Sequence, residues 1–193
     1  AKKGTYILSN NLFTATFVEA DGKLRFGGAP QLGLLPQTEL FKIRLAEGQE
    51  VAASAMTLKG VQLLKLKGEA DAIKGAHKLD GQAIEAEFEF AGLDICWRAV
   101  LRNGSHYLRT ELELTARQDV AMHSIIPMCY LVDNLNGTEV PKVVGNTRGA
   151  VVANNRIFAG LETPTGLNSV GEAVQGASPI QGLWSRQTTL QAG

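Results

Sequence analysis

Residues 71–115 read DAIKGAHKLDGQAIEAEFEFAGLDICWRAVLRNGSHYLRTELELT, and this stretch decides the fold. Apolar and polar residues alternate along it with a period of two, which is typical of half-buried β-strands. The alternation is interrupted by three dipeptides, Asp80-Gly81, Ala91-Gly92 and Asn103-Gly104. Asp-Gly and Asn-Gly favour type I′ turns, which need a positive φ at both central residues, and Ala-Gly is a weaker form of the same signal. We therefore expect a meander of four antiparallel strands.

Each expected turn fixes a register between two strands. A turn at Asp80-Gly81 pairs Ile73 with Phe88, a turn at Ala91-Gly92 pairs Phe88 with Ile95, and a turn at Asn103-Gly104 pairs Ile95 with Leu112. All three registers place the apolar residues on one face, and a slip of one residue would destroy that arrangement. The opposite face then carries charged residues, namely Glu85, Glu87, Glu89, Arg98, Arg109, Glu111 and Glu113.

The apolar face of such a meander must be covered by a second layer. Further strands are expected at 11–19, 23–26, 40–45, 61–67, 121–132, 151–161 and 182–190. Pro127 interrupts one of them and indicates an edge strand or a bulge. About a dozen strands exceed the number in an immunoglobulin-like module of roughly 100 residues. We therefore predict an all-β fold, a large two-sheet antiparallel β-sandwich, as a single domain over residues 1–193.

The composition argues against several classes of protein. The 193 residues include 19 basic and 19 acidic side chains, so no nucleic-acid partner is expected. No apolar run approaches the ~20 residues that span a bilayer, so no membrane insertion is expected. Hydrophobic residues make up 45% of the chain, too many for a disordered protein. Cys96 and Cys129 can pair or remain buried thiols, and two cysteines cannot form a disulfide framework.

The sequence contains no catalytic signature. His77, His106 and His123 share no metal-site spacing, and neither a phosphate-binding loop nor a nucleophile elbow occurs. Paired carboxylates would indicate a glycosidase, but the glutamates of the meander follow the strand period and are explained as a solvated face. We predict no catalytic residue, no metal and no cofactor.

A carbohydrate-binding site is predicted around Trp184. An indole ring stacks on the C–H face of a sugar, and arginine and asparagine side chains bond to its hydroxyl groups. Arg186 follows two residues later, on the same side of a strand, and Asn146 and Arg148 add polar groups. In the alternative interpretation, Trp184 belongs to the core of the sandwich and its polar neighbours are merely solvated.

Two parts of the chain resemble a known family. The sequence FVE at 17–19, followed by DGKL at 21–24, resembles the first hairpin of the N-terminal β-supersandwich domain of many glycoside hydrolases, which has the galactose-mutarotase-like fold. The sequences VVGNTRGAVV at 143–152 and FAGLE at 158–162 resemble secreted Bacteroides-type proteins of this kind. Those proteins are α-galactosidase- or melibiase-like, and some are labelled enterotoxin.

The resemblance implies a supporting function. In that family a (β/α)8 barrel follows the sandwich and holds the catalytic aspartates. The implied function is therefore a non-catalytic N-terminal domain of a secreted or periplasmic glycan-degrading enzyme, which packs on the barrel and contributes to the rim of the sugar site. The implied partners are a carbohydrate and the barrel of the same chain. Two alternatives stay open: a stand-alone carbohydrate-binding module, and an aldose mutarotase, whose family uses a histidine pair with a carboxylate.

Overall fold

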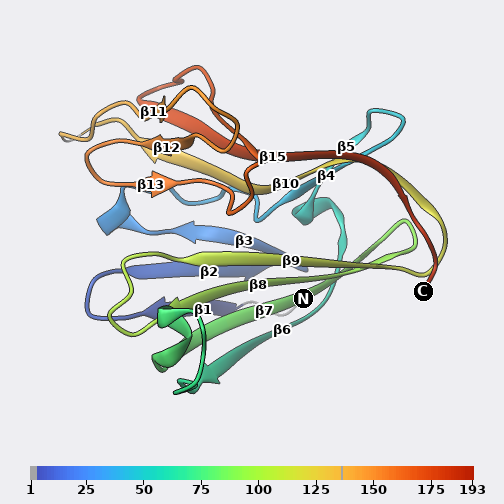
Figure 1. Cartoon of the computed structure of the whole chain (residues 1–193), viewed down its shortest axis with the longest axis horizontal. Coiled ribbons are helices and arrows are strands. Elements are labelled where there is room, and N and C mark those ends of the chain that lie inside the picture. Colours follow the sequence, from blue (N-terminus) through green and yellow to red (C-terminus); the bar gives the residue numbers. More distant parts are fainter. Residues whose placement is uncertain (1–3, 136) are drawn as a thin grey trace.

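The computed structural model describes residues 4–135 and 137–193, except for the side chain of Arg186. Within these residues helical structure is confined to three short 3-10 turns, η1 (Pro30–Leu32), η2 (Ala53–Ala55) and η3 (Gly75–Lys78). The strands form four antiparallel sheets (Figure 1). The predicted all-β sandwich is therefore confirmed. No helix in the described part of the chain has the length and apolar character needed to cross a membrane.

One layer of the sandwich is a four-stranded meander with an apolar inner face and a polar outer face. Phe88 pairs with Ile95 across the turn at Ala91-Gly92, as predicted. The φ values of the two turn residues are 47° and 80°, both positive as a type I′ turn requires. Phe88, Ile95 and Trp97 are buried, and Leu112 packs partly buried against them. Its strands are, in order, β6 (Thr57–Leu66), β7 (Gly81–Phe90), β8 (Leu93–Arg102) and β9 (Arg109–Ala116).

The first strand of the meander differs from the prediction. Phe88 pairs with Leu58 of β6, not with Ile73, whose side chain is fully exposed. The turn at Asp80-Gly81 does not form, because the Asp80 carboxylate accepts hydrogen bonds from the Gly68 amide (2.8 Å) and from Lys67 Nζ (3.2 Å). Residues 67–80 therefore leave the sheet as a separate segment, here called the excursion, which contains η3.

The pairing of β8 with β9 is displaced by two residues from the prediction. Ile95 pairs with Leu114 rather than with Leu112. The turn expected at Asn103-Gly104 is a longer loop, because the Asn10 side-chain amide donates to the carbonyl oxygens of Arg102 and Ser105, each at 2.9 Å. A displacement by two keeps the alternation of side chains, so the buried face is unchanged.

Three further sheets complete the fold (Figure 1). The hairpin predicted at Asp21-Gly22 joins the last two strands of an N-terminal sheet made of β1 (Gly4–Ser9), β2 (Thr14–Ala20) and β3 (Lys23–Gly28). A five-stranded sheet has the order β14 (Leu167–Val170), β15 (Ala177–Leu190), β10 (Val120–Asp133), β4 (Lys42–Leu45) and β5 (Glu50–Ala52). A small sheet consists of β11 (Lys142–Val144), β12 (Val151–Ala153) and β13 (Phe158–Ala159).

The position of strand β10 distinguishes the two predictions for Pro127, an edge strand or a bulge. It lies inside its sheet, with β15 on one side and β4 on the other, so the edge-strand reading is wrong. Its pairing with β15 shifts in register between Ile125 and Met128. The bulge is therefore confirmed, and it occurs here because proline has no N–H to donate to the ladder.

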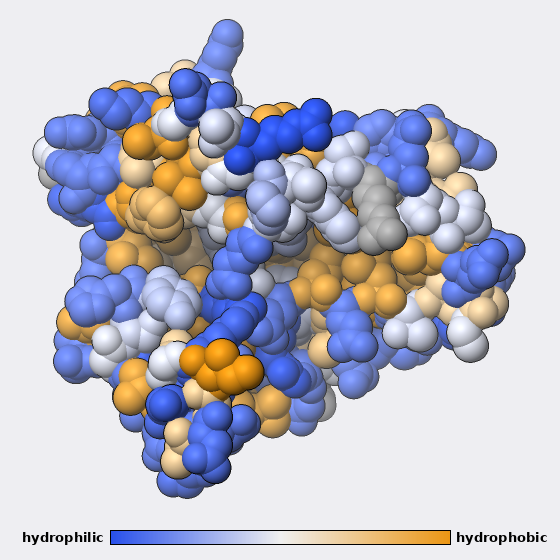
Figure 2. Space-filling view, viewed as in Figure 1, coloured by the Kyte–Doolittle hydropathy of each residue, from blue (hydrophilic) through white to orange (hydrophobic). Residues whose placement is uncertain are grey.

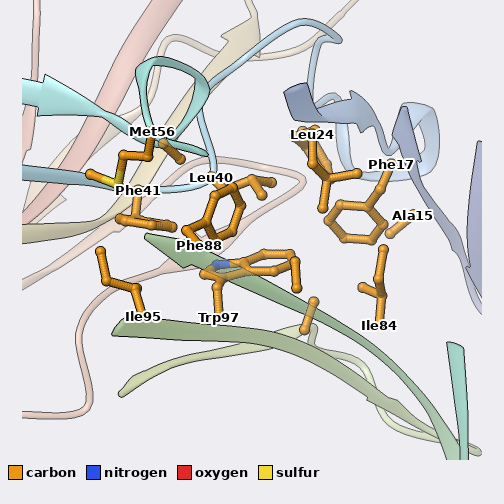
Figure 3. Close-up of a cluster of buried hydrophobic side chains, with 14 of the residues drawn as sticks. Ala15, Phe17, Leu24, Leu40, Phe41, Met56, Ile84, Phe88, Ile95 and Trp97 are labelled. Atoms are coloured by element: carbon orange, nitrogen blue, oxygen red, sulfur yellow. The ribbon is translucent and has the colours of Figure 1, made fainter. Parts of the chain in front are cut away.

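Aromatic rings connect the layers through the core. The Phe17 ring of β2 lies 5.4 Å from the Trp97 ring of β8 and 5.6 Å from the Phe26 ring of β3. Phe26 in turn lies 5.0 Å from Tyr130 of β10. Figure 3 shows Phe17 reaching down to Trp97 from the opposite layer. All three contacts are edge-to-face, the geometry that aromatic pairs favour.

Candidate functional site

The predicted sugar-binding residues do not form one pocket. Trp184 is half-buried in β15 and lines a groove that includes neither Asn146 nor Arg148. Asn146 and Arg148 are both exposed, in the loop between β11 and β12. Arg186 also belongs to β15, but its side chain lies outside the described part of the structure.

The groove lined by Trp184, here called the apolar groove, separates the meander from the five-stranded sheet. It encloses about 220 Å³. In Figure 2 apolar surface shows in the gap between the upper layer, which holds β15, and the lower layer, which holds β9. Among the described residues that line it, the polar side-chain groups are the hydroxyls of Ser124 and Thr188 and the indole N–H of Trp184, whereas a sugar needs several converging donors and acceptors. The groove is lined by Leu114 of β9, by Met122, Ser124 and Ile125 of β10, and by Trp184, Thr188 and Leu190 of β15.

A second concavity, here called the η3 basin, lies on the polar outer face of the meander and encloses about 180 Å³. Its floor consists of outward side chains of β8 and β9, including Arg98, Arg109 and Glu111. One wall is the excursion, which contributes His77 and lies at the lower left of Figure 1. The other wall is the β8–β9 loop, which contributes Tyr107.

Ion pairs hold the arginine side chains of the floor in place. Arg98 Nε donates to Glu85 at 2.9 Å, and this contact holds the pKa of the Glu85 carboxyl below its ordinary value. Arg109 lies between two carboxylates, with Nη2 3.0 Å from Glu162 and Nε 3.4 Å from Glu111. Such partly exposed pairs contribute at most about 1 kcal/mol each to stability. Their larger effect is to restrict the guanidinium groups to one orientation.

Arg102 ties the excursion to the floor. Its Nη1 donates to the carbonyl oxygen of Leu79 at 2.8 Å and to that of Lys67 at 3.2 Å, one near each end of the excursion. No carboxylate of the described residues forms an ion pair with Arg102, so its guanidinium is held by carbonyl oxygens and keeps its positive charge. One guanidinium thus holds the wall of the basin and keeps a positive charge in the basin lining.

The β8–β9 loop presents the Tyr107 ring at the basin. The hydroxyl of Ser105, a buried residue, donates to the Tyr107 carbonyl at 3.2 Å and accepts from the Tyr107 amide at 3.3 Å. The backbone of Tyr107 is therefore fixed from both sides. Its side chain remains 52% exposed, so the ring is available to a ligand.

The three histidines occupy separate places. His77 belongs to η3, outside the strands of the meander, and lines the basin. His106 is exposed in the β8–β9 loop, and His123 of β10 contacts Ser124 Oγ through Nδ1 at 3.2 Å. Within residues 4–135 and 137–193 no group of three or more His, Cys, Asp or Glu side chains is arranged to hold a metal ion. Cys96 and Cys129 are both free.

Sequence reasoning missed the basin although it recognised the floor. The outward positions of Arg98, Arg109 and Glu111 follow from the strand period, and that period alone indicates a solvated face rather than a concavity. The available signal was the return of arginine at outward positions of two neighbouring strands. The walls of the basin are the excursion and the β8–β9 loop. The conformation of both segments depends on long-range hydrogen bonds, so the local sequence does not predict it.

Glu89 lies at the other end of the outer face, and its ion pairs are expected to make the stability of the fold depend on pH. Arg117 Nη2 at 2.7 Å and Lys59 Nζ at 2.9 Å hold the pKa of Glu89 at about 2, below the ordinary 4.5. A lowered folded pKa stabilises the fold above pH 4.5, and this contribution disappears as the pH falls through about 2. We expect the urea midpoint to fall less steeply over this window in Glu89→Gln than in the wild type. Parallel pH profiles would contradict this expectation.

Comparisons of the chain with protein-family models, with curated proteins and with solved structures gave no match. A β-sandwich on its own supports many unrelated functions. A function for this chain therefore rests on the chemistry of the η3 basin and of the apolar groove.

Proposed function

We propose that this chain is a non-catalytic, carbohydrate-binding β-sandwich domain of a glycan-degrading enzyme, and that the η3 basin is its sugar subsite. The supporting observation is the meeting of an exposed Tyr107 ring with oriented Arg98 and Arg109 side chains and the Glu111 carboxylate in one concavity. The ring offers a flat apolar face for stacking, and the charged groups offer donors and acceptors to hydroxyl groups.

The size and rigidity of the basin suit a single sugar residue. Its volume of about 180 Å³ is smaller than the roughly 300–1,000 Å³ typical of sites for drug-sized ligands. Because ion pairs already orient Arg98 and Arg109, a ligand loses little side-chain entropy when it binds them. The polar lining favours the basin over the apolar groove, so Tyr107 replaces Trp184 as the proposed stacking platform.

The context of the domain follows the family resemblance. The segments at 17–24 and 143–162 support a place ahead of a (β/α)8 barrel in a secreted or periplasmic enzyme, with the catalytic acids in the barrel. In that setting the basin adds a contact at the rim of the sugar site. One of the three histidines lines the basin, whereas an aldose mutarotase uses a pair, and this favours binding over catalysis.

A glycan array followed by calorimetry with the best ligand tests the sugar subsite. Tyr107→Ala is expected to weaken binding about tenfold, which corresponds to about 1.4 kcal/mol. Phe158→Ala is the matched control, since Phe158 is a 76% exposed aromatic residue of β13 that does not line the basin. Its affinity should equal that of the wild type.

Three outcomes would contradict the proposal. Loss of binding in Trp184→Ala with normal binding in Tyr107→Ala would move the site to the apolar groove. Absence of binding to every arrayed glycan would remove the sugar function itself. Hydrolysis of aryl glycosides, or faster mutarotation of fresh α-galactose that depends on His77, would make the chain an enzyme.

A further inference from the structure

The charged side chains of the η3 basin come from separate parts of the chain. The lysine and arginine residues of its lining are Lys74 of the excursion, Arg98 and Arg102 of β8, and Arg109 of β9. The carboxylates of the lining are those of Glu69 and Glu111. Within the lining, cations therefore outnumber carboxylates, and the remaining charge is balanced by carboxylates that belong to other segments.

One of these further carboxylates is that of Glu162, which reaches the basin from the loop between β13 and β14. Its side chain is 62% exposed. A single oxygen, Oε2, lies 3.0 Å from Arg109 Nη2 and 3.9 Å from Lys74 Nζ. Glu162 thereby connects the floor of the basin with its wall, and these contacts show that Arg109 and Lys74 together accept one carboxylate group.

The contacts of Glu162 are weak enough to be exchanged. Its carboxylate has no other hydrogen bond or ion pair among the described residues, and exposed ion pairs contribute at most about 1 kcal/mol each. Glu85 differs, because its side chain is only 13% exposed and accepts from Arg98 Nε at 2.9 Å. A ligand carboxylate can therefore replace Glu162 at Arg109 and Lys74 while the pair of Arg98 with Glu85 stays in place.

The charges of the basin leave a place for one anion when Glu162 withdraws. Not counting the histidine, the four cations of the lining face four carboxylates, those of Glu69, Glu85, Glu111 and Glu162. Arg102 forms no ion pair in the described part of the chain, and its Nε is buried there without a hydrogen-bond partner. The nearby Asp80 pairs with Lys67 outside the lining and does not change this balance. Without Glu162 one positive charge is in excess, and such a cleft attracts an anionic ligand.

We propose, on the basis of the sugar subsite proposed above, that the η3 basin selects an acidic sugar, a uronic acid residue. Its ring stacks on Tyr107, and its carboxylate takes the place of Glu162 between Arg109 and Lys74. A hydrogen bond between an arginine and a carboxylate is roughly twice as strong as one between neutral groups. The neutral sugar with a hydroxymethyl group at the same carbon offers no charge to these cations, so the difference in affinity comes from the carboxylate.

NMR titration of the intact chain with the methyl glycosides of glucuronic acid, galacturonic acid, glucose and galactose tests this inference. We expect the better uronate to bind about tenfold more tightly than its neutral counterpart, and Tyr107→Ala to weaken its binding. Glu162→Gln should bind the uronate about threefold more tightly, because the competing carboxylate is gone, and should bind the neutral sugar as the wild type does. Lys74→Ala should weaken uronate binding about threefold and leave the neutral sugar unaffected.

Glu172→Gln is the matched control for Glu162→Gln. Glu172 is exposed between β14 and β15 and does not line the basin. The substitution removes the same charge from the chain, so the uronate affinity of this variant should equal that of the wild type. An equal gain in both variants would mean that the net charge of the chain, not the place of Glu162, sets the affinity.

The results that overturn this inference differ from those that overturn the sugar subsite. If neutral sugars, alone or as arrayed glycans, bind at least as tightly as the uronates and Tyr107→Ala weakens them, the subsite stands and its selection of acidic sugars is wrong. Unchanged uronate affinity in Glu162→Gln would show that the ligand does not replace Glu162. Displacement of the uronate by an equal concentration of sodium acetate would mean an anion site without a sugar contact. If no sugar or arrayed glycan binds, both proposals fail.

Discussion

Replacing Phe17 with alanine is expected to destabilise the protein by about 3–5 kcal/mol, the range for a large aromatic residue removed from a core. Phe17 is 1% exposed, and its ring contacts both Trp97 of the meander and Phe26 of the N-terminal sheet. Alanine therefore leaves a cavity where two layers meet, and the layers cannot close it without moving their strands. Urea denaturation followed by circular dichroism measures the loss.

Two variants make this expectation specific. Phe17→Leu keeps most of the volume and should cost less than half as much, because it removes the edge-to-face contacts but leaves a smaller cavity. Phe158→Ala removes an exposed aromatic ring and should change stability by less than about 0.5 kcal/mol. A loss below about 1.5 kcal/mol in Phe17→Ala would show that Phe17 does not hold the two layers together.

Gly68→Ala is expected to cost about 1–3 kcal/mol and to weaken ligand binding at the η3 basin. A methyl group at this position would overlap the carbonyl group of Lys78, which is backbone and cannot rotate away. The two ends of the excursion would have to separate where the Gly68 amide donates to Asp80. The wall that carries His77 would then shift relative to the floor. Urea denaturation and calorimetry with the array-selected sugar measure the two effects.

Gly75→Ala is the matched control for Gly68→Ala. Gly75 lies in the same excursion, has no positive φ, and a methyl group there would have no neighbour within 4 Å. Its stability and sugar affinity should equal those of the wild type. Equal behaviour of the two alanine variants would show that the close contact at Gly68 does not position the wall.

The parts of the fold that the sequence predicts are those set by local rules. The inner face of the meander follows from a side-chain period of two, and the turn at Ala91-Gly92 follows from two adjacent residues with positive φ. The conformation of the loop at Asn103-Gly104 depends instead on a long-range hydrogen bond. Asn10 lies 92 residues before Arg102 in the chain and bonds to its carbonyl group. A contact of that range leaves no mark on the local sequence, so the register shift could not be foreseen.

In the candidate site, too, local sequence predicts some features, whereas long-range contacts determine others. Arg98 and Arg109 are placed on the outer face by strand period alone, but a concavity also needs walls, and these depend on the long-range bonds of Asp80 and Asn10. Residue type alone predicts Trp184 as a sugar platform. Most other residues that line its groove come from β9 and β10, more than 50 residues earlier in the chain, so positions close to Trp184 do not reveal the apolar character of its surroundings.

The anchoring of the excursion separates its length from the pairing of the sheet. Arg102 bonds to the carbonyl groups of Lys67 and Leu79, and Asp80 bonds to Gly68, so these anchors to the sheet lie at the base of the excursion. Insertions, deletions and substitutions between these points leave the pairing of β6 with β7 untouched. A change in the length of this segment is therefore expected to reshape the wall of the η3 basin without a matching change in the core.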